Sequence, residues 1–155
     1  MKKLELTSTA FTEGGTIPTQ YTGDGKDVSP PLRWSGAPAG TRSFALICDD
    51  PDAPRKTWVH WVLFNLPADM NELPEAVPAE RTLARGARQG TNDFGKIGYG
   101  GPAPPRGHGA HRYFFKLYAL DTTLDLQPGA TKADVEAAMK GHVLAEGQLM
   151  GKYER

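Results

Sequence analysis

The chain of 155 residues has one cysteine, no net charge and no long apolar segment. The single cysteine, Cys48, cannot form an internal disulfide, and it ends the apolar run 44–48, so we expect a buried and unreactive thiol. The 18 basic and 18 acidic residues cancel. This balance argues against nonspecific nucleic-acid binding and against polybasic attachment to a membrane.

No segment resembles a membrane span or a secretory signal. The longest nearly apolar run, residues 58–66, is interrupted by His60 and Asn65 and is far too short to cross a bilayer. Residues 1–11 carry two lysines with no apolar stretch behind them, unlike a secretory signal. We therefore expect a cytoplasmic protein with no nucleic-acid partner and no integral membrane association.

Glycine and proline, by contrast, are plentiful, with 18 and 13 residues spread along the whole chain. This distribution indicates many turns within a single domain, residues 1–155, rather than two domains on a linker. Apolar, β-prone runs predict strands at residues 43–48, 58–66 and 112–120, with weaker candidates at 4–7, 83–88 and 143–153. The long coil 16–38 should pack onto a sheet or serve the function.

Only one stretch is convincingly helical. Thr131 and Asp134 form an approximate capping box, Val135 and Met139 follow at helical spacing, and Gly141 supplies the stop. Several strands with one short helix predict a mainly β fold, an antiparallel sandwich or barrel.

Three carboxylates follow the first strong strand directly, and a histidine lies inside the next one. The carboxylates are Asp49, Asp50 and Asp52, and the histidine is His60. Strict alternation predicts that His60 shares a face with four apolar residues, Trp58, Val62, Phe64 and Leu66. An aspartate beside a histidine can fix its tautomer, and crowding of carboxylates can keep one of them protonated.

A second polar group gathers at the start of the third strand. His111 and Tyr113 share one face there, after a loop, residues 92–109, with six glycines and three prolines. Glycines let backbone N–H groups approach a ligand, and prolines stiffen the loop. A local excess of basic residues between Arg81 and Arg112 could attract an anion.

Each feature also has an ordinary structural explanation. His60 could be a satisfied core histidine and the acidic run 49–52 a solvated turn. The loop 92–109 could be a long connector and the basic stretch a solvated face. Three functional interpretations compete with these. A metal site would use His60, His108, His111, Asp50 and Asp52, but no helix presents His108 and His111 together. Nucleophilic hydrolysis lacks a Gly-x-Ser-x-Gly elbow. A pocket for an anionic or phosphate-bearing group fits the imidazole, hydroxyl and backbone donors best.

The motifs Asp50-Pro51-Asp52-Ala53-Pro54, Trp58, His60, Gly100-Gly101-Pro102-Ala103-Pro104-Pro105 and His111-Arg112-Tyr113 occur in that order. Together with Ser29-Pro30-Pro31-Leu32 and Trp34, they closely resemble the signature of the phosphatidylethanolamine-binding protein family. The short spacer 55–57 resembles the bacterial and archaeal, Raf-kinase-inhibitor-like branch.

The resemblance implies a sandwich of two antiparallel sheets with Greek-key connections and one or two short helices. It also implies a pocket for phosphate-like anions or phosphoethanolamine-type head groups, lined by Asp50, His60, Gly101, Pro104, Pro105, His111 and Tyr113. Supporting residues would be Asp52, Pro54 and Trp58, with a cis bond often preceding the proline that matches Pro54. No catalytic residue, metal or cofactor is implied.

The eukaryotic members' C-terminal helix is absent, since residues 147–153 read as a strand, which questions a kinase-inhibitor role that depends on that helix. We expect a non-enzymatic binding protein with a small phosphate-bearing or anionic ligand. A protein partner, through regulation of phosphorylated proteins, and a homodimer both remain open. The alternative from another class is a metal-dependent phosphoesterase.

Overall fold

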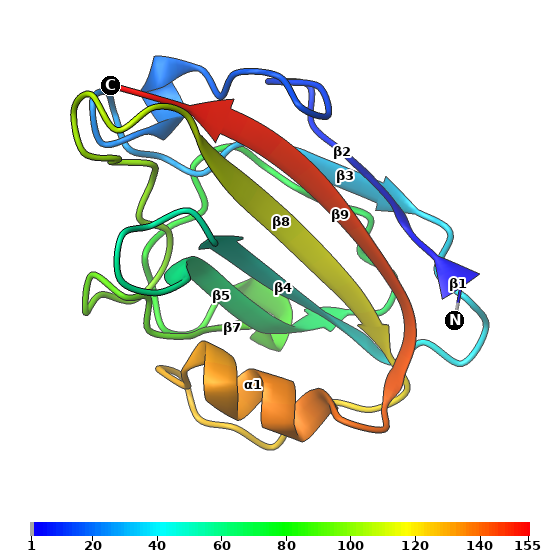
Figure 1. The fold of residues 1–155 in the computed structure, drawn as a ribbon. Helices are drawn as coiled ribbons and strands as arrows, with labels where there is room; N and C mark the ends of the chain where they lie inside the picture. Colours follow the sequence, from blue (N-terminus) through cyan, green and yellow to red (C-terminus); the bar gives the residue numbers. More distant parts are fainter. Residues whose placement is uncertain (1) are drawn as a thin grey trace.

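The computed structural model describes residues 2–155, which form two β-sheets and one α-helix (Figure 1). The large sheet has the strand order β1-β9-β8-β4-β5-β7 and is antiparallel except for the β1–β9 pair. Its strands are β1 (Lys2–Lys3), β9 (Val143–Tyr153), β8 (His111–Leu120), β4 (Ser43–Asp50), β5 (Trp58–Pro67) and β7 (Arg88–Gln89). The small sheet comprises β2 (Glu5–Thr7), β3 (Leu32–Ser35) and β6 (Glu72–Leu73). The prediction of a mainly β fold with two sheets and a short helix is confirmed.

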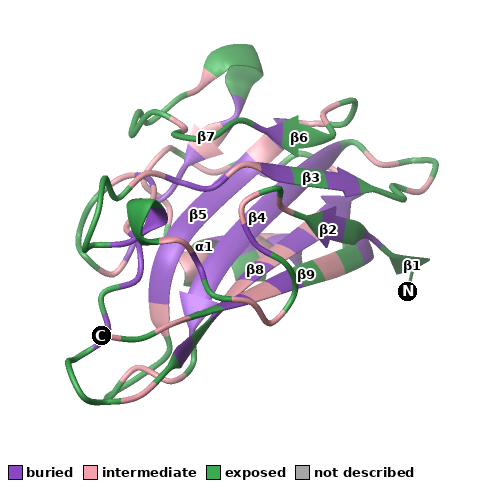
Figure 2. Cartoon of the chain, turned by 90° about the horizontal axis from the view of Figure 1, so that it is seen from above, coloured by how far each residue is buried: buried purple, intermediate pink, exposed green. Residues whose placement is uncertain are grey.

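The large sheet is covered on both faces, which explains why every residue of β4 is buried. One face packs against the small sheet in a core that contains Trp34, Phe44 and Trp61. The other face packs against α1 (Lys132–Met139), which lies across it in Figure 1 and contributes Val135 and Met139. Figure 2 shows the resulting buried centre of the sheet beneath exposed loops.

Local signals placed the long strands and the helix correctly. The four strand predictions at 43–48, 58–66, 112–120 and 143–153 match β4, β5, β8 and β9, and the weak candidate at 4–7 contains β2. The capping box is present, because Thr131 Oγ1 accepts a hydrogen bond from the Asp134 amide and the Asp134 carboxylate accepts one from the Thr131 amide. Gly141 then adopts a left-handed φ of 83°. Cys48 is buried as expected.

One strand prediction fails, and the predicted coil contains regular structure. Residues 83–88 form a turn around the 3₁₀ segment η2 (Ala84–Gly86), in which Arg85 has a φ of 66°, and only the short β7 pairs with β5. The stretch 16–38 is not all coil: η1 (Thr19–Tyr21) and β3 lie within it, and β3 is the centre of the small sheet. Within residues 2–155, no helix is long and apolar enough to cross a membrane.

The predicted face of His60 is correct for Trp58, since both rings pack against Phe94, but wrong for Val62 and Phe64, because strand β5 contains a β-bulge. Cys48 pairs with Trp61 and Asp49 pairs with Val59, so His60 is an extra residue opposite that step. A bulge turns the extra side chain onto the face of its neighbour. His60 therefore points to the face of Trp61 and of Tyr113, while Val62 packs on the opposite face beneath α1.

Candidate functional site

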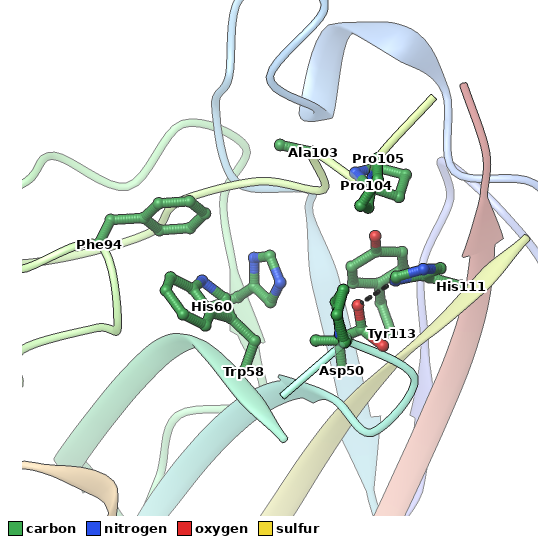
Figure 3. Close-up of a pocket in the computed structure, with 11 residues that line it drawn as sticks. Asp50, Trp58, His60, Phe94, Ala103, Pro104, Pro105, His111 and Tyr113 are labelled. Carbon is green, nitrogen blue, oxygen red and sulfur yellow. Dashed lines mark hydrogen bonds and ion pairs between the residues drawn. The ribbon is translucent and has the colours of Figure 1, made fainter. Parts of the chain in front are cut away.

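A cavity of about 200 Å³ opens where the ends of β4, β5 and β8 meet the Gly/Pro loop (Figure 3). Its volume equals roughly that of seven water molecules at about 30 Å³ each, enough for a small oxyanion. It is lined by Asp50, Ala53, Pro54, Trp58, His60, Phe94, Ala103, Pro104, Pro105, His111 and Tyr113. Six of the seven residues that the sequence predicts for the binding site therefore lie around one cavity.

His60 is held by the main chain of the Gly/Pro loop. Its Nδ1 lies 2.6 Å from the carbonyl oxygen of Gly100, and because a carbonyl only accepts, Nδ1 carries the hydrogen. The ring packs edge-on against Tyr113 and Phe94, at centroid distances of 5.1 and 5.5 Å. Burial lowers the pKa of His60, which favours the neutral ring. Within residues 2–155, nothing hydrogen-bonds to its Nε2.

Tyr113 supplies the second polar group. Burial, and next the charge of Asp50, raise the pKa of Tyr113 far above its usual value, so the hydroxyl stays protonated. Among the described residues, this hydroxyl has no hydrogen-bond partner, and in Figure 3 it is directed toward Pro104 and Pro105. It is therefore available as a donor to a ligand.

Asp50 joins the two ends of the site. Its Oδ1 accepts from the amide of Asp52 at 2.7 Å, and its Oδ2 lies 2.6 Å from Nδ1 of His111. The two side chains are only 4% and 2% exposed. The carboxylate thus fixes the orientation of the His111 ring, as expected for an aspartate beside a pocket histidine.

His111 is more constrained than its sequence position indicates. Its second ring nitrogen, Nε2, lies 2.6 Å from Nδ1 of His108. Both nitrogens of His111 therefore have protein partners, and the ring lines the cavity without a free nitrogen. From the sequence, His108 is predicted only as a candidate metal ligand.

The three neighbouring carboxylates do not share a site. Asp49 is buried toward α1, where Lys132 and Lys116 approach it at 2.8 and 3.2 Å. Asp52 accepts two hydrogen bonds of 2.9 Å from the guanidinium of Arg112, which lowers the pKa of Asp52. With three separate sets of partners, the structure gives no support to a carboxylate kept protonated by crowding.

The Gly/Pro loop offers fewer backbone donors than expected. The amide of Gly100 donates to the His60 carbonyl, and the amide of Gly101 donates to Asp27 Oδ1 at 2.7 Å. Gly101 does not line the cavity. A Cβ there would collide with the Tyr21 carbonyl oxygen, so this glycine allows the loop to pack closely against residues 21–27.

Other predicted residues fall into two groups. Pro54 and Trp58 line the cavity directly, whereas Asp52 lies outside it, and the Ala53–Pro54 bond is trans. Phe94, which the sequence pattern does not single out, is 41% exposed and packs against Trp58 with ring centroids 5.5 Å apart. The available signal is an aromatic residue in a glycine-rich loop, which also contains Tyr99. Residues 2–155 contain no group of three histidine, cysteine or acidic side chains arranged to hold a metal.

Comparison with known proteins concerns the family and the fold of the chain. The sequence model of the family "Phosphatidylethanolamine-binding protein" matches residues 7–154. A UPF0098 protein of Methanothermobacter thermautotrophicus is 57% identical over 152 residues, which cover 98% of this chain and 99% of that protein. A phosphatidylethanolamine-binding protein homolog from Chlamydia trachomatis has a crystal structure with a TM-score of 0.90 and 40% identity, covering 100% of this chain and 99% of that one. E. coli YbcL, described as a new member of the mammalian PEBP family, gives a TM-score of 0.91 at 36% identity, with 99% of each chain covered.

Proposed function

Because the chain belongs to the phosphatidylethanolamine-binding protein family, we propose that its cavity binds a small oxyanion. The proposed ligands are phosphate and the phosphoryl group of a phosphoethanolamine head group. The observation that carries the proposal is a pair of polar groups in a largely apolar cavity, Nε2 of His60 and the hydroxyl of Tyr113. Neither is hydrogen-bonded to any residue of 2–155, so both can form a hydrogen bond with a ligand that enters the cavity.

The two groups become donors in different ways. The Tyr113 hydroxyl is protonated at any physiological pH and donates as it stands. Nε2 of His60 donates only when the ring takes up a proton, because Nδ1 already donates to Gly100. A bound anion favours the charged ring and opposes the effect of burial on its pKa. Because the ligand makes few contacts, we expect a Kd of about 1 mM, which corresponds to a binding free energy of about −4 kcal/mol.

The mouth of the cavity suits a head group that carries an ammonium. Trp58 and Phe94 pack edge to face there, and the ammonium of Lys56 already lies 5.8 Å from the Trp58 ring. Aromatic faces attract such cations. The phosphoryl group would lie near His60 and Tyr113, with the ethanolamine nearer the aromatic rings.

The cavity binds without catalysing a reaction in this proposal. Its lining contains no serine, threonine or cysteine. Burial raises the pKa of Cys48 well above its usual value, so its thiol is a poor nucleophile. The described residues form no metal cluster, which counts against a metal-dependent phosphoesterase. The phosphoryl group of a modified partner protein has the same chemistry, so a regulatory role would use this cavity too.

Titration with phosphate, followed through the ring signals of the histidines, tests the proposal. The signals of His60 and His111 should move together, because both rings line the cavity. His142, an exposed residue bonded to Asp121, is the internal control and should stay unchanged. Movement of the His142 signal without movement of the His60 and His111 signals would contradict the assignment of the cavity.

A further inference from the structure

His108 completes a chain of three hydrogen-bonded side chains that begins in the cavity and ends at the surface. Oδ2 of Asp50 contacts Nδ1 of His111, and Nε2 of His111 contacts Nδ1 of His108, each at 2.6 Å. Asp50 and His111 are buried, whereas His108 is exposed. The chain therefore connects a carboxylate beside the proposed ligand to a group that exchanges protons with solvent.

The contact between the two imidazoles holds one hydrogen. When His111 is neutral, its Nδ1–H donates to Asp50, and Nε2 accepts from Nδ1–H of His108. When His111 is protonated, Nε2–H donates and Nδ1 of His108 accepts. One added proton is thus accommodated by exchanging the roles of donor and acceptor, whereas protonation of both rings leaves two N–H groups facing each other.

The loop itself does not force the two rings together. His108 lies between Gly107 and Gly109, whose φ angles are 75° and 91°, and a Cβ at either glycine would meet nothing within 4 Å. The neighbouring backbone hydrogen bonds are long, 3.3 Å from the Gly107 amide to the Arg155 carbonyl and 3.2 Å from the His108 amide to the Pro105 carbonyl. Glycines in open space allow many conformations, so the short contact between the rings fixes the position of His108.

Of the described residues that line the cavity, Asp50 is the one carboxylate, and its ion-pair partner is His111. Asp52 is paired with Arg112, and Asp24 is paired with Arg155 and accepts from the Tyr153 hydroxyl. Tyr113, on the same strand as His111, remains neutral. The loop 92–109 also carries Asp93, which is paired with Lys56, and the cations Lys96 and Arg106. Asp27 accepts from the Gly101 amide and is a second carboxylate whose charge acts on His60. An anion in the cavity would meet the Asp50 carboxylate, which repels it unless a proton on the histidines offsets that charge.

We propose that His108 is a positioning residue of the oxyanion site, sharing with His111 the proton that offsets the charge of Asp50 when an oxyanion binds. This inference rests on the proposed function of the cavity. Binding of an oxyanion draws a proton from solvent into the histidine pair. His108 does not contact the ligand and acts through His111.

The test compares wild type with His108→Gln, because glutamine can keep a hydrogen bond to His111 but cannot take up a proton. The probe is sulfate, whose charge is constant over the range studied, from about pH 5.5 to about pH 8.5, around the ordinary histidine pKa of about 6.5. At about pH 6 the variant should bind sulfate about three- to tenfold more weakly. This factor corresponds to the difference in strength between a charge-assisted and a neutral hydrogen bond. At about pH 8.5 the two proteins should bind sulfate with equal affinity.

Calorimetry in two buffers of different ionisation enthalpy then counts the protons taken up on binding. Wild type should take up more protons than His108→Gln, whereas the matched control His142→Gln, which removes an imidazole bonded to Asp121 away from the cavity, should behave as wild type.

Two failures are distinguishable. Absence of sulfate and phosphate binding by wild type would overturn the proposed function, and with it the role of His108. Sulfate binding by His108→Gln with the wild-type affinity, pH profile and proton uptake would overturn the role of His108 alone.

Discussion

Asp50 and His111 form a buried hydrogen bond of 2.6 Å between residues 61 positions apart in the sequence. Asp50 ends β4, and His111 begins the adjacent strand β8, so the antiparallel pairing of the two strands brings the side chains together. This bond sets the orientation of one wall of the cavity. Changes at these two residues should therefore affect both folding and binding.

Replacement of Asp50 by asparagine separates a binding role from a turn. Asp50 accepts two hydrogen bonds, whereas an amide offers one acceptor and one donor, so the contact with Nδ1 of His111 survives only with the other tautomer of His111 and without the carboxylate charge. We expect Asp50→Asn to lower the free energy of unfolding by about 1–3 kcal/mol and to weaken phosphate binding. Denaturant unfolding and calorimetric titration measure the two effects. Lower stability with unchanged phosphate affinity at about pH 6 and about pH 8 would reduce the acidic run to a turn.

His60 should make stability depend on pH. Burial lowers its pKa in the folded chain below the ordinary value of about 6.5, so the unfolded chain binds more protons as the pH falls. Without ligand, the free energy of unfolding should fall below about pH 6.5, and it should continue to fall until the folded-state pKa is reached. His60→Gln, which cannot titrate, should show a shallower fall in unfolding measured from about pH 8 to about pH 5. An identical slope in wild type and variant contradicts this prediction, and His142→Gln serves as the control.

Removal of the Tyr113 hydroxyl should affect binding alone. Because the hydroxyl has no partner among residues 2–155, Tyr113→Phe should leave the free energy of unfolding within about 0.5 kcal/mol of wild type. Loss of one donor should weaken phosphate binding about two- to twelvefold. Calorimetry and thermal melts measure both quantities. Tyr118→Phe is the matched control, because Tyr118 lies on β8 facing the other side of the sheet; equal effects in both variants would contradict the assignment.

Gly101 should be essential for the loop. A Cβ would collide with the Tyr21 carbonyl and approach Oδ1 of Asp27 to 2.5 Å, at the residue whose amide donates to that carboxylate. We expect Gly101→Ala to destabilise the fold by about 1–3 kcal/mol, as overpacking usually does. At Gly23, where the nearest heavy atom would be 3.3 Å away, alanine should cost much less. Denaturant unfolding compares the two variants, and equal costs would show that the loop adapts.

Catalysis should be absent. Purified protein should not hydrolyse a phosphomonoester, with or without added divalent cations, because the cavity lining holds no hydroxyl or thiol nucleophile besides the Tyr113 phenol. Release of phosphate in a colorimetric assay is the measurement. Turnover that disappears in His60→Ala would show that the cavity is an active site.

The sequence by itself determined the elements that depend on near neighbours. Long β-prone runs predicted β4, β5, β8 and β9, and a capping box predicted the start of α1, since each signal lies within a few residues. Alternation also placed His111 and Tyr113 on one face of β8 correctly, because that strand pairs with β4 without interruption. The family resemblance then brought the motif residues into one expected pocket.

Tertiary structure decided what depends on pairing between distant segments. The bulge that turns His60 into the cavity follows from the register between β4 and β5, which simple alternation cannot reveal. Strands as short as β3 and β6 form only because they pair with each other and pack against the large sheet. Likewise, the Gly101 amide is taken by a carboxylate 74 residues away, and the second nitrogen of His111 by a histidine in a glycine-rich loop. The donors left for a ligand are therefore fixed by hydrogen bonds that only the folded chain creates.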